Sequence, residues 1–290
     1  MRLIDFAIFE QIFCMKLTLG FSTCPNDTFI FDAMVHQKVD TEGLEFEVVM
    51  ADVEELNRNA FDGNIDITKL TYHAFAYIAD NYKLLTSGSA LGYKNGPLLI
   101  SKKKLYPDEV ADLKVAIPGK YTTANLLFSI SFPVIKEKIE YLFSDIEEAI
   151  LSNEVDAGVI IHENRFTFEK KGLRKIIDLG EDWEERTKNP IPLGGIVINR
   201  KFDNEIQQKV NRVLKRSVEF ALANPNSSYG FVKNYAQELH DDVIEKHINL
   251  YVNKFTVDLG PIGKKAVKTL YDKALEKEIF KKILNDIFVE

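Results

Sequence analysis

The chain has 290 residues, a length that fits one large domain or two small ones. Hydrophobic residues make up 46% and charged residues 28%, which is typical of globular proteins and excludes a disordered or fibrous chain. The net charge of −7 disfavours general nucleic-acid binding, because a phosphate backbone needs a basic partner surface. A small anionic ligand in a local basic or amide-rich pocket stays compatible with this charge.

Residues 1–15 are interpreted as an N-terminal extension. They are apolar, but Asp5 and Glu10 interrupt the stretch and no small-residue cleavage site follows, so a secretory signal is the weaker alternative. No apolar run approaches the roughly 20 residues that span a bilayer. We therefore expect a cytoplasmic protein that does not act at a membrane. Its two cysteines, Cys14 and Cys24, are expected to be free thiols, which excludes a disulfide scaffold and a cysteine-rich metal site.

Short β-rich runs alternate with amphipathic helical stretches in the first part of the chain. The predicted strands, each with the helix that follows it, are 17–21 with 26–36, 44–50 with 52–62, and 65–70 with 72–81. Strand–helix–strand alternation of this kind predicts a parallel sheet covered by helices.

The pattern changes at 82–101, where the apolar runs 83–86 and 97–101 flank the glycine-rich stretch 87–96. Further strands are then predicted at 113–117, 139–143, 156–161, 174–179 and 193–199, with helices after the first two. From residue 203 to the end the sequence is typical of helix, with breaks at 224–226 and 260–261.

These elements are interpreted as two α/β lobes. The first lobe comprises 16–98 plus 200–290, and the second comprises 99–199. The chain would cross between the lobes twice, near Pro97 and near Asn199. Two crossings form a hinge with an interlobe cleft, and such clefts are favoured ligand sites.

Candidate site residues are those that follow predicted strands, because ligands of open α/β sheets bind beyond the carboxyl ends of the strands. The run from Ser22 to Thr28 follows the first strand, and its polar side chains and amides suit a helix start or an anion. Simple N-capping by Asn26 or Asp27 is the alternative. Cys24 could be a nucleophile at a helix N-terminus, but a lone cysteine without an obvious base is more often a packed small residue.

Lys69 ends the third predicted strand, where a buried charge is costly unless it is used. It could pair with Asp62 or Asp66, or it could meet a ligand carboxylate. Beyond a later strand, the run from Gly119 to Asn125 permits an unusual turn, in which Thr122 or Thr123 could cap the next helix. Small residues in that run would also let backbone amides approach a ligand.

His162 follows the predicted strand 156–161 and has the pKa range that general acid–base catalysis needs. Glu163 or Asn164 could orient it, although a single histidine is often structural. His240 and His247 could share a helix face, but no third metal ligand is evident, so we expect no metal site.

A further candidate segment contains the single tryptophan. Trp183 could be a core or hinge aromatic. Arg186 could clamp a carboxylate, but pairing with Glu184 or Glu185 is favoured. Gly194–Gly195 opens the last predicted strand and could let the hinge flex.

Taken together, these motifs resemble the 1,4-dihydroxy-6-naphthoate synthases of the futalosine route to menaquinone. The matching segments are 20–29, 68–72, 88–92, 119–124, 160–167 and 183–187, in an alignment that runs from residue 16 to the C-terminus. The resemblance implies a two-lobed fold like that of type II periplasmic binding proteins. It also implies a cytoplasmic lyase that converts cyclic dehypoxanthinyl futalosine, a small anionic substrate, to 1,4-dihydroxy-6-naphthoate and dihydroxyacetone, without metal or organic cofactor.

The resemblance assigns the role of base to His162. It implies substrate contacts for Lys69, Leu70 and Thr71 in the first lobe and for Thr123 and Ala124 in the second. To these we add Ser22 and Asn26, since amides at the start of a helix could hold substrate oxygens.

Alternative functions of the same fold are a small-acid solute-binding protein, the chorismate dehydratase of the same pathway, and the ligand-sensing domain of a regulator. The first would need an export signal and the last a DNA-binding segment before residue 16, and neither is evident. A homodimer is possible.

Overall fold

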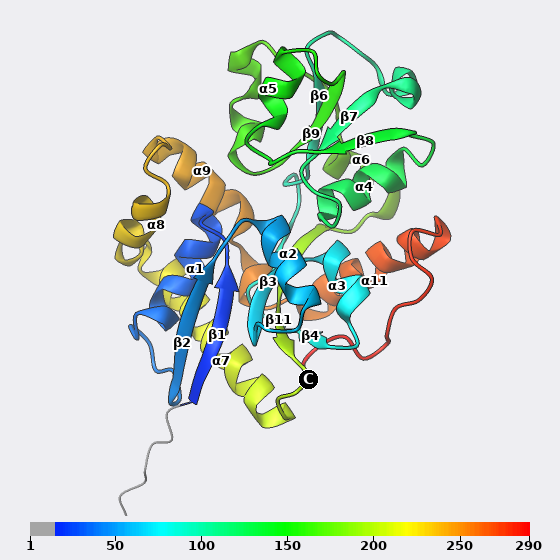
Figure 1. Cartoon of the computed structure of the whole chain (residues 1–290). Helices are drawn as coiled ribbons and strands as arrows, with labels where there is room; N and C mark the ends of the chain where they lie inside the picture. The colour runs from blue at the N-terminus through cyan, green and yellow to red at the C-terminus, as the bar shows by residue number, and fades with distance from the viewer. Residues whose placement is uncertain (1–14) are drawn as a thin grey trace, which may run out of the picture.

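The computed structural model describes residues 15–290, except for the side chain of Glu163. Residues 1–14 of the predicted extension, with Cys14, lie outside the described residues, whereas Met15 is the first residue of a strand. Two sheets organise the chain into two lobes, and Figure 1 shows the second lobe, in green, above the first.

The sheet of the first lobe has the order β2-β1-β3-β11-β4, and β5 also pairs with β11. Its strands are β1 (Met15–Phe21), β2 (Leu44–Met50), β3 (Ile67–Thr71), β4 (Tyr82–Leu84), β5 (Ala90–Gly92) and β11 (Ile191–Asn199). β1 runs parallel to β2 and β3, whereas β11 runs antiparallel to β3, β4 and β5. The parallel arrangement predicted from the first three strand–helix units is thus confirmed for β1, β2 and β3, and the antiparallel β11 makes the sheet as a whole mixed.

The sheet of the second lobe has the order β10-β6-β9-β7-β8. Its strands are β6 (Leu98–Ser101), β7 (Lys114–Ile117), β8 (Glu137–Glu140), β9 (Ala157–Ile160) and β10 (Arg174–Asp178). β7 is parallel to β8 and β9, while β6 is antiparallel to β9 and β10.

Helices cover both sheets (Figure 1). In the first lobe they are α1 (Pro25–Val35), α2 (Val53–Phe61), α3 (Tyr72–Ile78), α7 (Asn204–Ala223), α8 (Tyr229–Tyr235), α9 (Asp241–Tyr251), α10 (Lys254–Val257) and α11 (Gly260–Glu276). In the second lobe they are α4 (Thr123–Ser131), α5 (Ile146–Leu151) and α6 (Leu179–Thr187). Short 3-10 helices lie at Pro107–Asp112, His162–Phe166, Phe168–Lys171 and Pro225–Ser227.

Polar side chains at strand ends start several of these helices directly. Thr71 ends β3 and its hydroxyl accepts a hydrogen bond from the Ala74 amide, which caps α3. Asp178 ends β10 and caps α6 in the same way. Such side chains satisfy amides that have no partner within the helix, so the chain turns from strand to helix without a long loop.

The second crossing between the lobes differs from the predicted one. The strand predicted at 193–199 was expected in the second lobe. In the structure this strand, β11, pairs with β3, β4 and β5 of the first sheet. The chain therefore returns to the first lobe between Thr187, where α6 ends, and Ile191. An apolar run predicts a buried strand, but it does not specify which sheet that strand joins.

Three further elements differ from the sequence prediction. β5 lies within the glycine-rich stretch, and α6 follows a strand for which no helix was predicted. The helical C-terminal region ends at Glu276, and the chain then returns to the first sheet, where Phe288 bridges Leu84 in parallel. The predicted break at 224–226 is confirmed, since α7 ends at Ala223.

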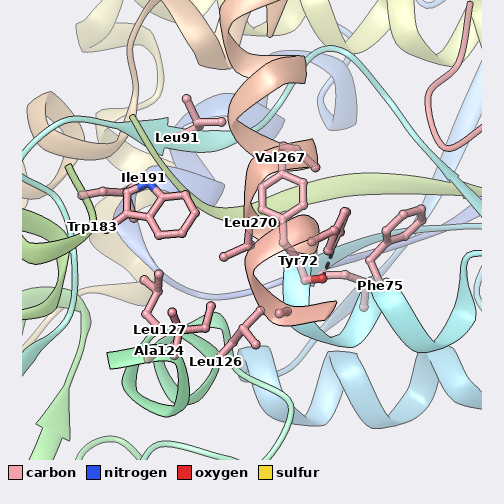
Figure 2. Packing of buried hydrophobic residues seen from close by; sticks show 14 of the residues in the cluster. Tyr72, Phe75, Leu91, Ala124, Leu126, Leu127, Trp183, Ile191, Val267 and Leu270 are labelled. Atoms are coloured by element: carbon pink, nitrogen blue, oxygen red, sulfur yellow. Dashed lines mark hydrogen bonds between the residues drawn. The ribbon is translucent and has the colours of Figure 1, made fainter. Parts of the chain in front are cut away.

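One hydrophobic cluster joins the two lobes (Figure 2). In it, Leu127 of α4 and Trp183 of α6 pack with Tyr72 of α3 and Leu270 of α11. Trp183 is 3% exposed, and its indole N–H donates to the carbonyl of Pro190 at 3.1 Å. Trp183 is therefore a core residue next to the second crossing. A core position is one of the two roles that the sequence predicted for it. Burial of such large side chains stabilises the contact between the lobes.

Close backbone packing marks the first crossing. A Cβ atom on Gly96 would lie 2.4 Å from the Cα atom of Gly180, so only glycine fits at this approach. The guanidinium of Arg165 donates to the Gly96 carbonyl and lies 3.4 Å from Asp178. The segment before β6 is thus held against the start of α6.

Gly194 and Gly195 lie inside β11, paired with Thr71 and Leu70 of β3. A Cβ atom on Gly194 would lie 2.7 Å from the carbonyl oxygen of Leu70. Here glycine allows close approach of two strands, which differs from the predicted role as a flexing point.

Candidate active site

A pocket between the lobes collects residues that follow the carboxyl ends of strands in both sheets. The pocket has a volume of about 670 Å³, which includes its opening to solvent. The eight predicted site residues all line it: Ser22, Asn26, Lys69, Leu70, Thr71, Thr123, Ala124 and His162. The structure therefore brings together residues that are up to 140 positions apart in the chain, since 162 − 22 = 140.

Asp27 organises the polar side chains of the first lobe at this pocket. Its carboxylate accepts hydrogen bonds from the Ser22 hydroxyl, the Asn26 amide and the Lys69 ammonium, each at 2.7 Å. The residue as a whole is 1% exposed. Three donors satisfy the buried carboxylate, which would otherwise be strongly destabilising.

The predicted N-capping by Asn26 or Asp27 is wrong. Both residues lie inside α1, and Cys24 occupies the N-cap position without a capping hydrogen bond from its side chain. Proline at the first helical position starts α1 instead, because its fixed φ suits a helix and its missing N–H has no partner to lose. Asn26 and Asp27 are thereby available to face the pocket.

The predicted partners of Lys69, Asp62 and Asp66, are also wrong. The Lys69 ammonium lies 2.7 Å from Asp27, and Asp66 pairs with Lys201. Residues 66 and 69 point to opposite faces of an extended strand, so they cannot meet. An ammonium has three N–H donors, and two remain after the contact with Asp27 for a ligand oxygen.

The start of α4 supplies the side of the pocket that belongs to the second lobe. Thr122 caps this helix, accepting from the Asn125 amide at 3.2 Å, which confirms one of the two predicted caps. Thr123 and Ala124 form the first turn, and the Thr123 hydroxyl donates to the Leu193 carbonyl at 2.6 Å. Amides in the first turn of a helix favour a bound anion or a developing negative charge.

His162 follows β9 and faces the pocket from the second lobe. Its backbone φ is +54°, a left-handed conformation that is uncommon for a residue with a side chain and is often found at functional sites. Its Nδ1 lies 3.4 Å from the Cys24 sulfur, and its ring lies 4.9 Å from the ring of Phe143. Of the two predicted orienting residues, Asn164 donates to the Phe143 carbonyl at 3.5 Å, and the Glu163 side chain is outside the described part of the chain.

His247 is a pocket residue whose role the sequence analysis missed. It lies on α9, and its ring stacks on that of His162 with a centroid distance of 6.2 Å and an angle of 8°. Its Nε2 lies 2.9 Å from the Asn26 side-chain oxygen. Burial, and to a lesser extent the nearby His162 and Lys69, hold its pKa well below the usual value, so the ring is neutral.

No local signal distinguishes His247 from other helical histidines in the sequence. Its position on the buried face of α9 is visible in the helix periodicity, but the pocket beneath that face is not. Within residues 15–290, no group of three or more His, Cys, Asp or Glu side chains is arranged to hold a metal ion.

Arg186 lies outside the pocket. It pairs with Asp182 at 2.8 Å, one helical turn earlier, so the predicted pairing with Glu184 or Glu185 is corrected. Residues four apart share a face of a helix, whereas direct neighbours do not.

Polar contacts close the pocket on the side of α2 and α3. Glu54 of α2 accepts from the Tyr121 amide at 3.2 Å, and Arg58 pairs with Glu140 of β8 at 2.8 Å. The His73 ring, on α3, lies with Nδ1 3.1 Å from the Thr122 carbonyl oxygen. These contacts join the first lobe to the second, so the structure is that of a closed cleft.

His73 makes the folded protein sensitive to acid. Burial lowers the pKa of His73 to about 4, whereas an unfolded histidine titrates near 6.5. Between these values the unfolded state binds one more proton, so stability falls as the pH is lowered from about 6.5 to about 4. We expect the His73 contribution to the free energy of unfolding to drop by about 2 kcal/mol between pH 7 and pH 5.

Urea unfolding of the wild type and of His73→Asn at pH 7 and pH 5 measures this effect. Asparagine can still donate to the Thr122 carbonyl but does not titrate, so the variant should lose less stability on acidification. An equal loss in both proteins would contradict the assignment to His73.

The architecture defines a class of protein. It is the two-lobed α/β fold of the periplasmic-binding-protein type, with a polar pocket between the lobes. The alkanesulfonate-binding protein SsuA from Xanthomonas axonopodis pv. citri has this fold, with a TM-score of 0.69 at 14% identity over 94% of this chain and 96% of its own. A protein from Archaeoglobus fulgidus is more similar, with a TM-score of 0.86 and 35% identity over 91% of this chain and 98% of its own.

A family model for menaquinone biosynthesis matches residues 17–276. The 1,4-dihydroxy-6-naphthoate synthase of Thermus thermophilus is 43% identical, over 89% of this chain and 93% of its own. That of Streptomyces coelicolor is 38% identical, over 89% of this chain and 92% of its own. The chain belongs to this family of menaquinone-biosynthesis enzymes, which confirms the family and the two-lobed fold expected from the sequence.

Proposed function

We propose that the protein is a lyase that converts cyclic dehypoxanthinyl futalosine to 1,4-dihydroxy-6-naphthoate and dihydroxyacetone, with His162 as the base that starts the reaction. The observation that carries the proposal is the position of His162, in one interlobe pocket with Lys69 and with the first turn of α4. Relatives at 43% and 38% identity are named for the naphthoate product.

In this proposal the first step is removal of a proton from the substrate by neutral His162. Ring opening and elimination of the sugar-derived part follow, and aromatisation of the second ring supplies driving force. The base must reach the substrate directly or through one water, and a histidine that lines the pocket satisfies this requirement.

Charge that develops on substrate oxygens is held from both lobes. Lys69 keeps donors for a carboxylate or hydroxyl oxygen, and the amides of Thr123 and Ala124 are preorganised at the start of α4. The same groups would orient the substrate carboxylate. A closed cleft keeps water from the reaction, which strengthens these interactions.

Location in the cytoplasm is part of the proposal. No helix in residues 15–290 is long and apolar enough to cross a membrane.

Incubation of the purified protein with cyclic dehypoxanthinyl futalosine, followed by chromatography and mass spectrometry, tests the function. The expected result is formation of 1,4-dihydroxy-6-naphthoate together with dihydroxyacetone. Binding without product would show a carrier, and absence of binding would overturn the proposed substrate, with chorismate the next compound to try.

A further inference from the structure

We propose that Cys24 is a positioning residue for His162: its sulfur accepts a hydrogen bond from Nδ1–H of the imidazole, which leaves proton abstraction to Nε2. The inference rests on the proposed role of His162 as the base. It assigns Cys24 no covalent step.

The contact is direct and crosses the cleft. The Cys24 sulfur lies 3.4 Å from Nδ1 of His162, and the two residues are 138 positions apart, Cys24 in the first lobe and His162 in the second. A sulfur atom at this distance is a weak hydrogen-bond acceptor. Because the partners belong to different lobes, this contact links the two sides of the cleft.

Hydrogen bonds of the main chain fix the backbone of Cys24. Cys24 is the N-cap residue of α1, and its carbonyl accepts from the amides of Asp27 and Thr28, each at 3.1 Å. Its own amide lies 3.3 Å from the Ser22 hydroxyl oxygen. The first turn of α1 therefore holds Cys24 in place without any contribution from the contact with His162.

Cys24 and His162 line different hollows of the molecule. His162 lines the interlobe pocket, whereas Cys24 lines a neighbouring hollow together with Phe143 and residues 234–239. The sulfur thus contacts the imidazole from the side of the neighbouring hollow. Since the two ring nitrogens point away from each other, a ring with Nδ1 on the sulfur directs Nε2 towards the pocket.

The proposed tautomer, with the proton on Nδ1, is the one that the reaction needs. With Nδ1–H donated to sulfur, the lone pair of neutral His162 is on Nε2, and it accepts the substrate proton to give an imidazolium. The Nδ1–H···S hydrogen bond becomes stronger in that cation, because charged donors form stronger hydrogen bonds. Cys24 neither gains nor loses a proton in the step, and the proton on Nε2 is the one that the substrate gave up.

Three other groups lie near the imidazole. From α9, His247 presents a neutral ring at a centroid distance of 6.2 Å. From β3, the Lys69 ammonium is paired with Asp27, so its charge is compensated. Phe143 is apolar and contributes ring packing alone.

Steady-state kinetics of Cys24→Ala and Cys24→Ser over a range of pH test the proposal. In Cys24→Ala we expect kcat to fall about tenfold while KM changes by less than about twofold, which corresponds to one hydrogen bond made mainly in the transition state. The acid limb of the kcat/KM profile should move to lower pH, because the imidazolium has lost an acceptor. In Cys24→Ser the hydroxyl still accepts, so kcat and the acid limb should return towards the wild-type values.

Thr23→Ala is the matched control, since Thr23 is an exposed neighbour at the same turn and does not line the interlobe pocket. Three results would overturn the proposal: a wild-type acid limb and kcat in Cys24→Ala, the same losses in Thr23→Ala, or no recovery in Cys24→Ser. If the wild type itself gives no turnover, the proposed function falls and this inference with it. Wild-type turnover with an unchanged Cys24→Ala profile removes this inference alone.

Discussion

Replacement of His162 by alanine should reduce turnover of cyclic dehypoxanthinyl futalosine by about 10³-fold, while the substrate still binds. General-base catalysis contributes roughly 10²–10⁴-fold, and no other side chain of the pocket combines a neutral nitrogen with this position. In the described part of the chain the only other pocket histidine, His247, is buried and has Nε2 engaged with Asn26. The measurement is kcat together with a separate dissociation constant for the substrate.

A second variant, His162→Asn, controls for an effect of the substitution on the backbone conformation at this position. The left-handed φ of +54° at His162 is tolerated better by asparagine than by alanine, so His162→Asn should fold at least as well and be equally inactive. His240→Ala is the control, because His240 is an exposed N-cap residue of α9. Turnover within about tenfold of wild type in both His162 variants, with binding intact, would exclude His162 as the base.

Lys69→Met should lower the free energy of unfolding by about 3–5 kcal/mol, because it leaves the buried Asp27 carboxylate without its cation. Both side chains of the pair are almost fully buried, at 7% and 2% exposure. The double variant Asp27→Asn/Lys69→Met should recover much of this loss, since neither charge is then left alone. Urea unfolding at neutral pH gives all three values.

Substrate affinity separates the binding role of Lys69 from its structural role. If Lys69 holds a substrate oxygen, the double variant should regain stability but bind the substrate weakly. Lys201→Met is the matched control: Lys201 pairs with Asp66 but is about half exposed, and such pairs contribute about 0–1 kcal/mol. A double variant with wild-type affinity would show that Lys69 stabilises the fold and does not bind the substrate.

Predicting the start of α4 required only local sequence. Thr122 caps α4 because a hydroxyl at that position satisfies a helix amide, and this is readable from neighbouring residues. The residues after each strand could likewise be selected as site candidates, because strand polarity decides which end of a sheet holds a ligand. The family motifs then narrowed these candidates to six residues, the helix-start argument added Ser22 and Asn26, and all eight line one pocket.

The order of strands and the partners of charged side chains were not predictable in this way. β11 joins the first sheet although the chain reaches it from the second lobe, because strand pairing depends on backbone hydrogen bonds that any apolar strand can form. Lys69 meets Asp27, which is 42 positions away, instead of a nearby aspartate. The prediction chose aspartates that are close to Lys69 in the sequence, whereas the fold brings a more distant one into contact with it.

The sequence by itself determined the α/β class, the two-lobed organisation, the family and eight of the residues that line the pocket, because these depend on periodicity, local caps and motifs. Only the tertiary structure decided that Asp27 holds Lys69, that His247 stacks on His162 and that Cys24 contacts Nδ1 of His162. The physical reason is that such contacts join segments far apart in the chain, and their formation depends on how the two lobes pack.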